Sequence, residues 1–153
     1  MLFRTHVVSF LFLFLLIFEK LENPLIFLFV GLFATVLPDI DSSNSKIGKK
    51  GISKILTAFS KHRGIFHSLI FVGIVYFFLW KYFYVISFGF LIGYCLHLFL
   101  DCFTKRGVKL FYPFKFRIKG ILKSGGRFES FLFLLLGLGV LISLYFNLYS
   151  LLV

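Results

Sequence analysis

The sequence has few charged residues, few prolines and few cysteines, and these shortages exclude several classes of protein. Charged side chains make up 15% of the 153 residues, and the chain holds 3 Pro and 2 Cys. In a soluble domain about a quarter of the residues are charged, so this chain has too little polar surface for a water-soluble globule of its size. A soluble enzyme, a disordered tail and a secreted disulfide scaffold are therefore all disfavoured.

The sequence is instead rich in apolar residues, which make up 59% of the chain and include 25 Phe. Five apolar stretches predict helices at 7–18, 25–37, 65–80, 82–103 and 131–153. Only the last two reach the roughly 20 residues that a bilayer-crossing helix requires. We expect an all-α integral membrane bundle of about five helices, built as one domain over residues 1–153. The first two helices are short and form either full spans or a re-entrant hairpin.

The basic residues predict how this bundle lies in the membrane. Lys and Arg total 17 against 6 Asp and Glu, and five spans would place all of the basic residues except Lys20 and Lys81 on one side. The positive-inside rule then assigns the N-terminus and the loops 38–64 and 104–127 to the cytoplasm. We expect a multi-pass protein of the cytoplasmic membrane whose partners are lipids with anionic headgroups. We expect no nucleic-acid binding, and the sequence leaves the oligomeric state open.

The residues that can bind metal or move protons gather at the ends of the apolar stretches on this basic side. His97 and Asp101 are spaced i, i+4, so they share one helix face and could bind one divalent ion. The alternative is a hydrogen bond that satisfies both groups. Asp39 and Asp41 follow Pro38, where the carboxylates could bind metal or form a solvated turn.

Two further segments on the same side carry candidate groups. His62 and His67 flank Arg63, which could bind a phosphate or could simply be a topogenic charge. Glu129 begins the last stretch, where it would complement the helix dipole or act as a ligand or general base.

These elements together resemble a known family. They are His6, Leu37-Pro38-Asp39-Ile40-Asp41, His62-Arg63-Gly64 with His67-Ser68, Gly93-Tyr94 with His97, Asp101, Thr104 and Gly107, and Pro113. Their order resembles that in the membrane-bound metal-dependent hydrolases, which include the LexA-regulated inner-membrane proteins of bacteria. Two positions depart from the pattern, because Ser42 stands where relatives often carry another histidine and Lys105 replaces a common proline.

The resemblance implies roles for particular residues. The metal ligands would be His6, Asp39, His67, His97 and Asp101. His62 would be a sixth ligand or an acid–base group, Asp41 and Glu129 would be additional ligands or supporting and catalytic groups, and Arg63 and Thr104 would orient the substrate. We expect Arg127 to bind the substrate as well. The implied cofactor is a divalent metal, with zinc favoured over manganese or iron.

We therefore expect a hydrolase at the cytoplasmic leaflet that cleaves a lipid phosphoester or ester with metal-activated water. Two alternatives stay open at this point. A metal transporter would carry ionisable groups near the bilayer midplane, where this sequence has few. A non-catalytic scaffold would use the histidines to hold a structural metal.

Overall fold

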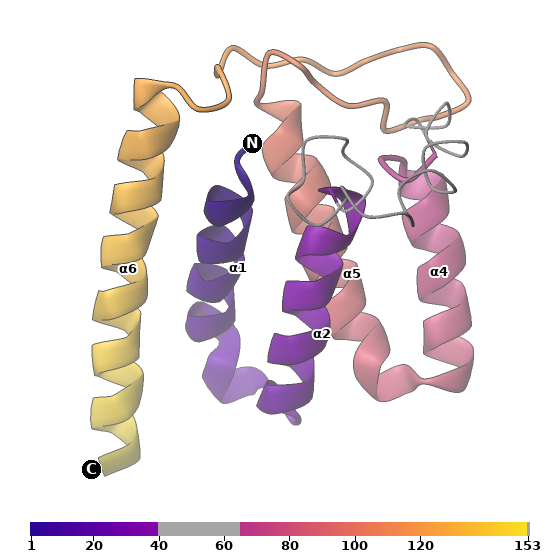
Figure 1. The fold of residues 1–153 in the computed structure, drawn as a ribbon. Coiled ribbons are helices and arrows are strands. Elements are labelled where there is room, and N and C mark those ends of the chain that lie inside the picture. Colours follow the sequence, from indigo (N-terminus) through magenta and orange to yellow (C-terminus); the bar gives the residue numbers. More distant parts are fainter. Residues whose placement is uncertain (40–64, 153) are drawn as a thin grey trace, which may run out of the picture.

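The computed structural model describes residues 1–39 and 65–152, which form a helical bundle (Figure 1). Its helices are α1 (Phe3–Ile17), α2 (Pro24–Val36), α4 (Leu69–Tyr82), α5 (Tyr84–Cys102) and α6 (Arg127–Leu152). Two short 3₁₀ helices, η1 (Phe18–Lys20) and η2 (Leu37–Asp39), follow α1 and α2. Within the described residues there is no extended sheet, so the predicted all-α fold is confirmed.

The helix boundaries follow from local chemistry. Pro24 occupies the first turn of α2, where its missing N–H costs nothing, and Pro38 lies in the 3₁₀ turn that ends the same segment. The Ser68 hydroxyl accepts a hydrogen bond from the Phe71 N–H at 3.3 Å and caps α4. The helices α1 and α6 each begin four residues before the apolar stretches predicted, at Phe3 and Arg127, because a first helical turn can include polar residues.

By length and composition, two helices among the described residues can cross a membrane, within Tyr84–Cys102 and Arg127–Ser150. The helices α1, α2 and α4 hold 15, 13 and 14 residues. Their rise of roughly 20 Å each is shorter than a hydrocarbon core of about 30 Å. The sequence predicted this division between two long and three short helices.

The centre of the bundle is a close contact between α2 and α5. A Cβ on Gly93 would lie 2.2 Å from the Gly31 carbonyl oxygen and 2.9 Å from the Thr35 hydroxyl, so only glycine fits there. The Thr35 hydroxyl donates to the Gly31 carbonyl at 2.7 Å and approaches the Gly93 carbonyl at 3.2 Å. This contact sets the distance between the two helices.

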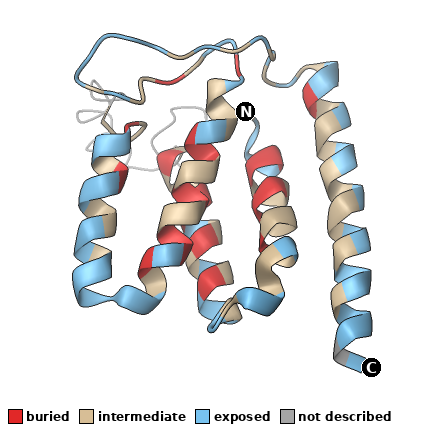
Figure 2. Ribbon diagram, turned by 180° about the vertical axis from the view of Figure 1, so that it is seen from behind, coloured by how far each residue is buried: buried red, intermediate tan, exposed pale blue. Residues whose placement is uncertain are grey.

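Apolar side chains complete the packing on both sides of this contact. One cluster comprises Ala34, Val72, Phe90, Tyr94 and Leu98, and another comprises Phe10, Phe14 and Phe27. The buried residues concentrate on α1, α2 and α5, whereas α4 and α6 are largely exposed (Figure 2). Their outer surfaces carry large apolar side chains such as Ile74, Phe77, Leu134 and Leu141, which is typical of a surface that faces lipid.

The N-terminus and the basic 104–126 segment lie at one end of the bundle, and the C-terminus lies at the other (Figure 1). The other end also holds Lys20 and the turn between α4 and α5 that follows Lys81. This arrangement meets the geometric requirement of the predicted topology. The orientation in the membrane stays a prediction.

Candidate metal centre

The end of the bundle that carries the basic segment also brings together imidazoles and carboxylates from separate elements. One group consists of His6 from α1, Asp39 from η2 and His97 from α5. A second group consists of His67, which precedes α4, with His97 and Asp101 of α5. In each group one ligand atom per residue lies within 4.8 Å of the others. The five residues that the resemblance assigned to metal binding therefore lie together.

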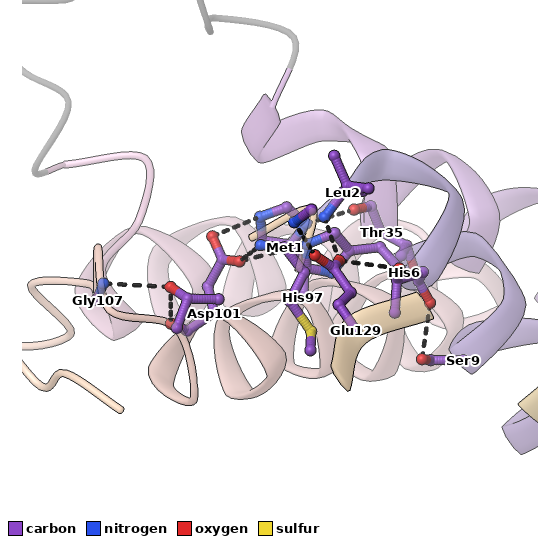
Figure 3. Close-up of polar contacts among 12 residues, drawn as sticks. Met1, Leu2, His6, Ser9, Thr35, His97, Asp101, Gly107 and Glu129 are labelled. Carbon is purple, nitrogen blue, oxygen red and sulfur yellow. Dashed lines mark hydrogen bonds and ion pairs between the residues drawn. The ribbon is translucent and has the colours of Figure 1, made fainter. Parts of the chain in front are cut away.

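His6, His97 and Asp101 form the inner part of this cluster (Figure 3). The rings of His6 and His97 are stacked with centroids 4.0 Å apart and an interplanar angle of 15°. The Asp101 carboxylate faces both, with Oδ1 at 3.3 Å from His6 Nε2 and Oδ2 at 3.6 Å from His97 Nε2. The amino group of Met1 also contacts Asp101 Oδ1, so this carboxylate already attracts a positive group.

A backbone carbonyl fixes the orientation of His97. The His97 Nδ1 atom lies 2.8 Å from the Thr35 carbonyl oxygen, and a carbonyl can only accept a hydrogen bond. Nδ1 must therefore carry the proton, which leaves Nε2 of the neutral ring with a free lone pair. In metal sites a histidine is commonly oriented by this kind of bond to its second nitrogen.

The burial of these groups makes their bonding state important. His6 is 1% exposed and His97 is fully buried. Among the described residues, neither nitrogen of His6 nor Nε2 of His97 has a hydrogen bond of acceptable geometry. Buried polar atoms without partners are costly, and the lone pairs of the neutral His6 and His97 rings can be satisfied by a water or by a cation. The donor set fits a divalent metal, because imidazole nitrogen and carboxylate oxygen suit zinc, manganese and iron.

The remaining two ligand candidates come from the ends of shorter segments. The His67 ring packs edge-on against His97, with centroids 5.7 Å apart. The Tyr94 hydroxyl donates to the Phe66 carbonyl at 2.6 Å and so holds the segment that carries His67 against α5. Asp39 is brought to the site by η2, in which Pro38 is buried.

Glu129 lies in a hydrogen-bonded clamp and belongs to neither ligand group. It is 1% exposed and accepts bonds from the Thr5 hydroxyl at 2.9 Å, the Leu2 N–H at 2.6 Å and the Gly125 N–H at 2.5 Å. These contacts join the start of α6 to the start of α1. This geometry gives Glu129 a structural task, and its catalytic role stays a prediction.

The other predicted residues have different outcomes. The Thr104 hydroxyl donates to the Asp101 carbonyl at 2.8 Å and accepts from the Gly107 N–H at 3.2 Å, which closes the turn after α5. Arg127 is exposed at the start of α6. Asp41, His62 and Arg63 lie outside the described residues. The substrate-binding roles of Thr104 and Arg127 stay predictions.

Sequence reasoning missed two contributors to the site. The Thr35 carbonyl orients His97, but a backbone group leaves no mark in a sequence. Thr5 donates a hydrogen bond to Glu129. In the sequence, its place directly before His6 is the feature that could have indicated a role at the site. The contact between these two helix starts depends on packing that periodicity does not reveal.

Comparison with known proteins identifies relatives of the chain. The model of the family described as YdjM inner membrane protein matches residues 1–151. A protein of Bacillus subtilis (strain 168), described as "Uncharacterized protein YvsG", is 36% identical over 101 residues. That alignment covers 63% of this chain and 63% of the relative, which is less than two thirds of its length. No solved structure matches the chain.

Proposed function

The chain belongs to the YdjM inner membrane protein family, and from this premise we propose that it is a metal-dependent hydrolase acting at the cytoplasmic membrane surface. The proposed substrate is a phosphoester or ester of a lipid with an anionic headgroup. The proposed topology is multi-pass with a cytoplasmic N-terminus, because that orientation puts nearly all basic residues on the inner side.

The observation that carries the proposal is the position of His97 between the Thr35 carbonyl and Asp101. Its Nε2 lone pair lies 3.6 Å from a carboxylate oxygen, so two acceptors face one another in a buried site. Such an arrangement favours a proton, a water or a cation between the acceptors. His6 and Asp39 in one group and His67 in the other offer further ligand atoms near His97, which favours a metal ion over a single proton.

A divalent ion held by these residues would act as a Lewis acid and would lower the pKa of a bound water molecule to near neutral. The chain's own residues would perform the remaining tasks. Asp41 or His62 would accept a proton from the water. Arg63 and Arg127 would bind the anionic part of the substrate, and Thr104 would help to orient it.

Elemental analysis and lipid hydrolysis of the detergent-purified protein test the proposal. We expect stoichiometric metal in the wild type, loss of metal and activity in His97→Ala, and retention of both in Ser87→Ala. Ser87 is a matched control because it is a buried polar residue of the same helix, and among the described residues its hydroxyl donates to the Tyr84 carbonyl of α5. Full metal content in His97→Ala would refute the site assignment.

The same experiment separates hydrolysis from the other uses of a metal site. Stoichiometric metal without turnover of any lipid would support a metal-binding scaffold instead. Metal uptake by proteoliposomes that contain the protein would support a transporter.

A further inference from the structure

The segment 111–119 after α5 combines three exposed phenylalanines with three basic residues and contains no acidic residue. Phe111, Phe114 and Phe116 are 49%, 70% and 65% exposed. The basic residues Lys115, Arg117 and Lys119 are exposed as well. We refer to residues 111–119 as the basic–aromatic segment.

Backbone contacts hold this segment in place. Val108 and Ile118 exchange N–H···O bonds of 3.0 and 2.9 Å, and the Phe114 N–H donates to the Phe111 carbonyl at 2.9 Å. Gly107 has φ +60°, and a Cβ there would lie 2.1 Å from the Ile118 carbonyl oxygen. Because the backbone is fixed in this way, the phenylalanines are exposed in a defined structure.

One hydrogen bond sets the depth of the segment relative to the bundle. The Leu69 N–H at the start of α4 donates to the Leu110 carbonyl at 2.9 Å. Leu69 and Ile70 are 39% and 51% exposed, so the apolar outer surface of α4 begins at this level. An apolar surface of α4 that faces lipid would put this level at the boundary between hydrocarbon and headgroups. The segment passes over α4 at this level (Figure 1).

This position explains why phenylalanine and basic residues occur together. Exposed phenylalanines are unfavourable in water, but at the headgroup boundary their rings can enter the acyl region. Lys and Arg at the same depth meet the phosphates of anionic lipids. The charge of the segment is therefore complementary to an anionic leaflet.

We propose that the basic–aromatic segment is a lipid-binding surface that docks on anionic headgroups beside α4. Phe111, Phe114 and Phe116 enter the interfacial region, and Lys115, Arg117 and Lys119 bind lipid phosphates. The contact holds the end of the bundle against the leaflet, and it does not depend on whether the neighbouring site hydrolyses lipid.

A tryptophan probe in nanodiscs tests the proposal on the full chain. The chain has one tryptophan, Trp80, so Phe114→Trp in a Trp80→Phe background gives a single fluorophore. The discs contain phosphatidylcholine alone or with phosphatidylglycerol, together with lipids that carry a nitroxide quencher near the top of the acyl chain. We expect quenching that rises when phosphatidylglycerol is present.

Charge variants show whether the basic residues cause that rise. The Lys115→Gln/Arg117→Gln pair should reduce the phosphatidylglycerol-dependent rise by about half or more. Lys105→Gln/Lys123→Gln removes the same charge from exposed positions outside the segment and should leave most of the phosphatidylglycerol-dependent rise in quenching. A Tyr145→Trp probe on the exposed surface of α6 should be quenched equally in both discs.

Several results would overturn the proposal. One is that neither Phe114→Trp nor the neighbouring Phe116→Trp is quenched. Another is that quenching is the same with and without phosphatidylglycerol. A third is that both pairs of charge substitutions reduce the phosphatidylglycerol-dependent rise equally. A response to added single-stranded RNA without a response to lipid would assign the surface to nucleic acid instead.

Discussion

His6 and His97 stack with their ring centroids 4.0 Å apart, although one lies near the start of α1 and the other in the second half of α5. This contact joins α5, which carries Asp101, to the start of α1, which is hydrogen-bonded to Glu129 of α6.

Metal affinity should fall most when the shared ligand is removed. His97 belongs to both ligand groups, whereas Asp39 and Asp101 each belong to one. We expect Asp39→Asn and Asp101→Asn each to weaken metal binding by about 10–100-fold, and His97→Ala to weaken it further. Competition with a chelator of known affinity measures these values. An aspartate variant that binds metal more weakly than His97→Ala does would contradict this order.

The close contact between α2 and α5 should tolerate no added methyl group. Gly93→Ala would place a Cβ 2.2 Å from the Gly31 carbonyl and would push the helices apart. We expect a loss of about 1–3 kcal/mol in the free energy of unfolding, with weaker metal binding. Thermal unfolding in detergent measures the first effect, and chelator competition measures the second.

Gly73→Ala is the control for this substitution. A Cβ on Gly73 has no atom within 4 Å, so the variant should keep both the stability and the metal affinity. Equal destabilisation by both variants would contradict this account of the α2–α5 contact, because the higher helix propensity of Ala would by itself stabilise both helices.

Replacement of Glu129 should weaken the attachment of α6 without removing metal. In Glu129→Gln the amide has one acceptor oxygen in place of two, so either the bonds from Thr5 and Leu2 or the bond from Gly125 lose their acceptor, at a cost of about 2 kcal/mol. Thermal unfolding and elemental analysis of the same sample check both parts. Thr5→Ser keeps a hydroxyl donor and should behave like the wild type. Loss of metal from a folded Glu129→Gln variant would make Glu129 part of the metal centre.

The proposed orientation predicts which ends of the bundle are accessible from outside the cell. In a Cys95→Ala/Cys102→Ala background, an impermeant maleimide should label Asn23→Cys in intact spheroplasts. It should label Lys123→Cys only after the membrane is permeabilised. Asn23 and Lys123 are both exposed and lie at opposite ends of the bundle, so each serves as the control for the other. The reverse pattern would invert the topology.

The sequence predicted the helices well because long runs of apolar residues dominate their formation. It also placed His97 and Asp101 on one face, since i, i+4 spacing requires nothing beyond helical geometry. Periodicity could not reveal that His6 stacks on His97, because that contact depends on how α1 packs beside α5. The resemblance supplied His6 as a ligand, but the orienting carbonyl of Thr35 and the clamp around Glu129 became visible only in three dimensions.

The clamp around Glu129 also has a consequence for the order of events during biosynthesis. Glu129 lies 127 residues after its partner Leu2 and 124 residues after its partner Thr5, so it is translated much later than either. The start of α1, with the neighbouring imidazole of His6, cannot gain this support until Glu129 has left the ribosome. The attachment of α1 to α6 is therefore completed only after the segment around Glu129 has been synthesised.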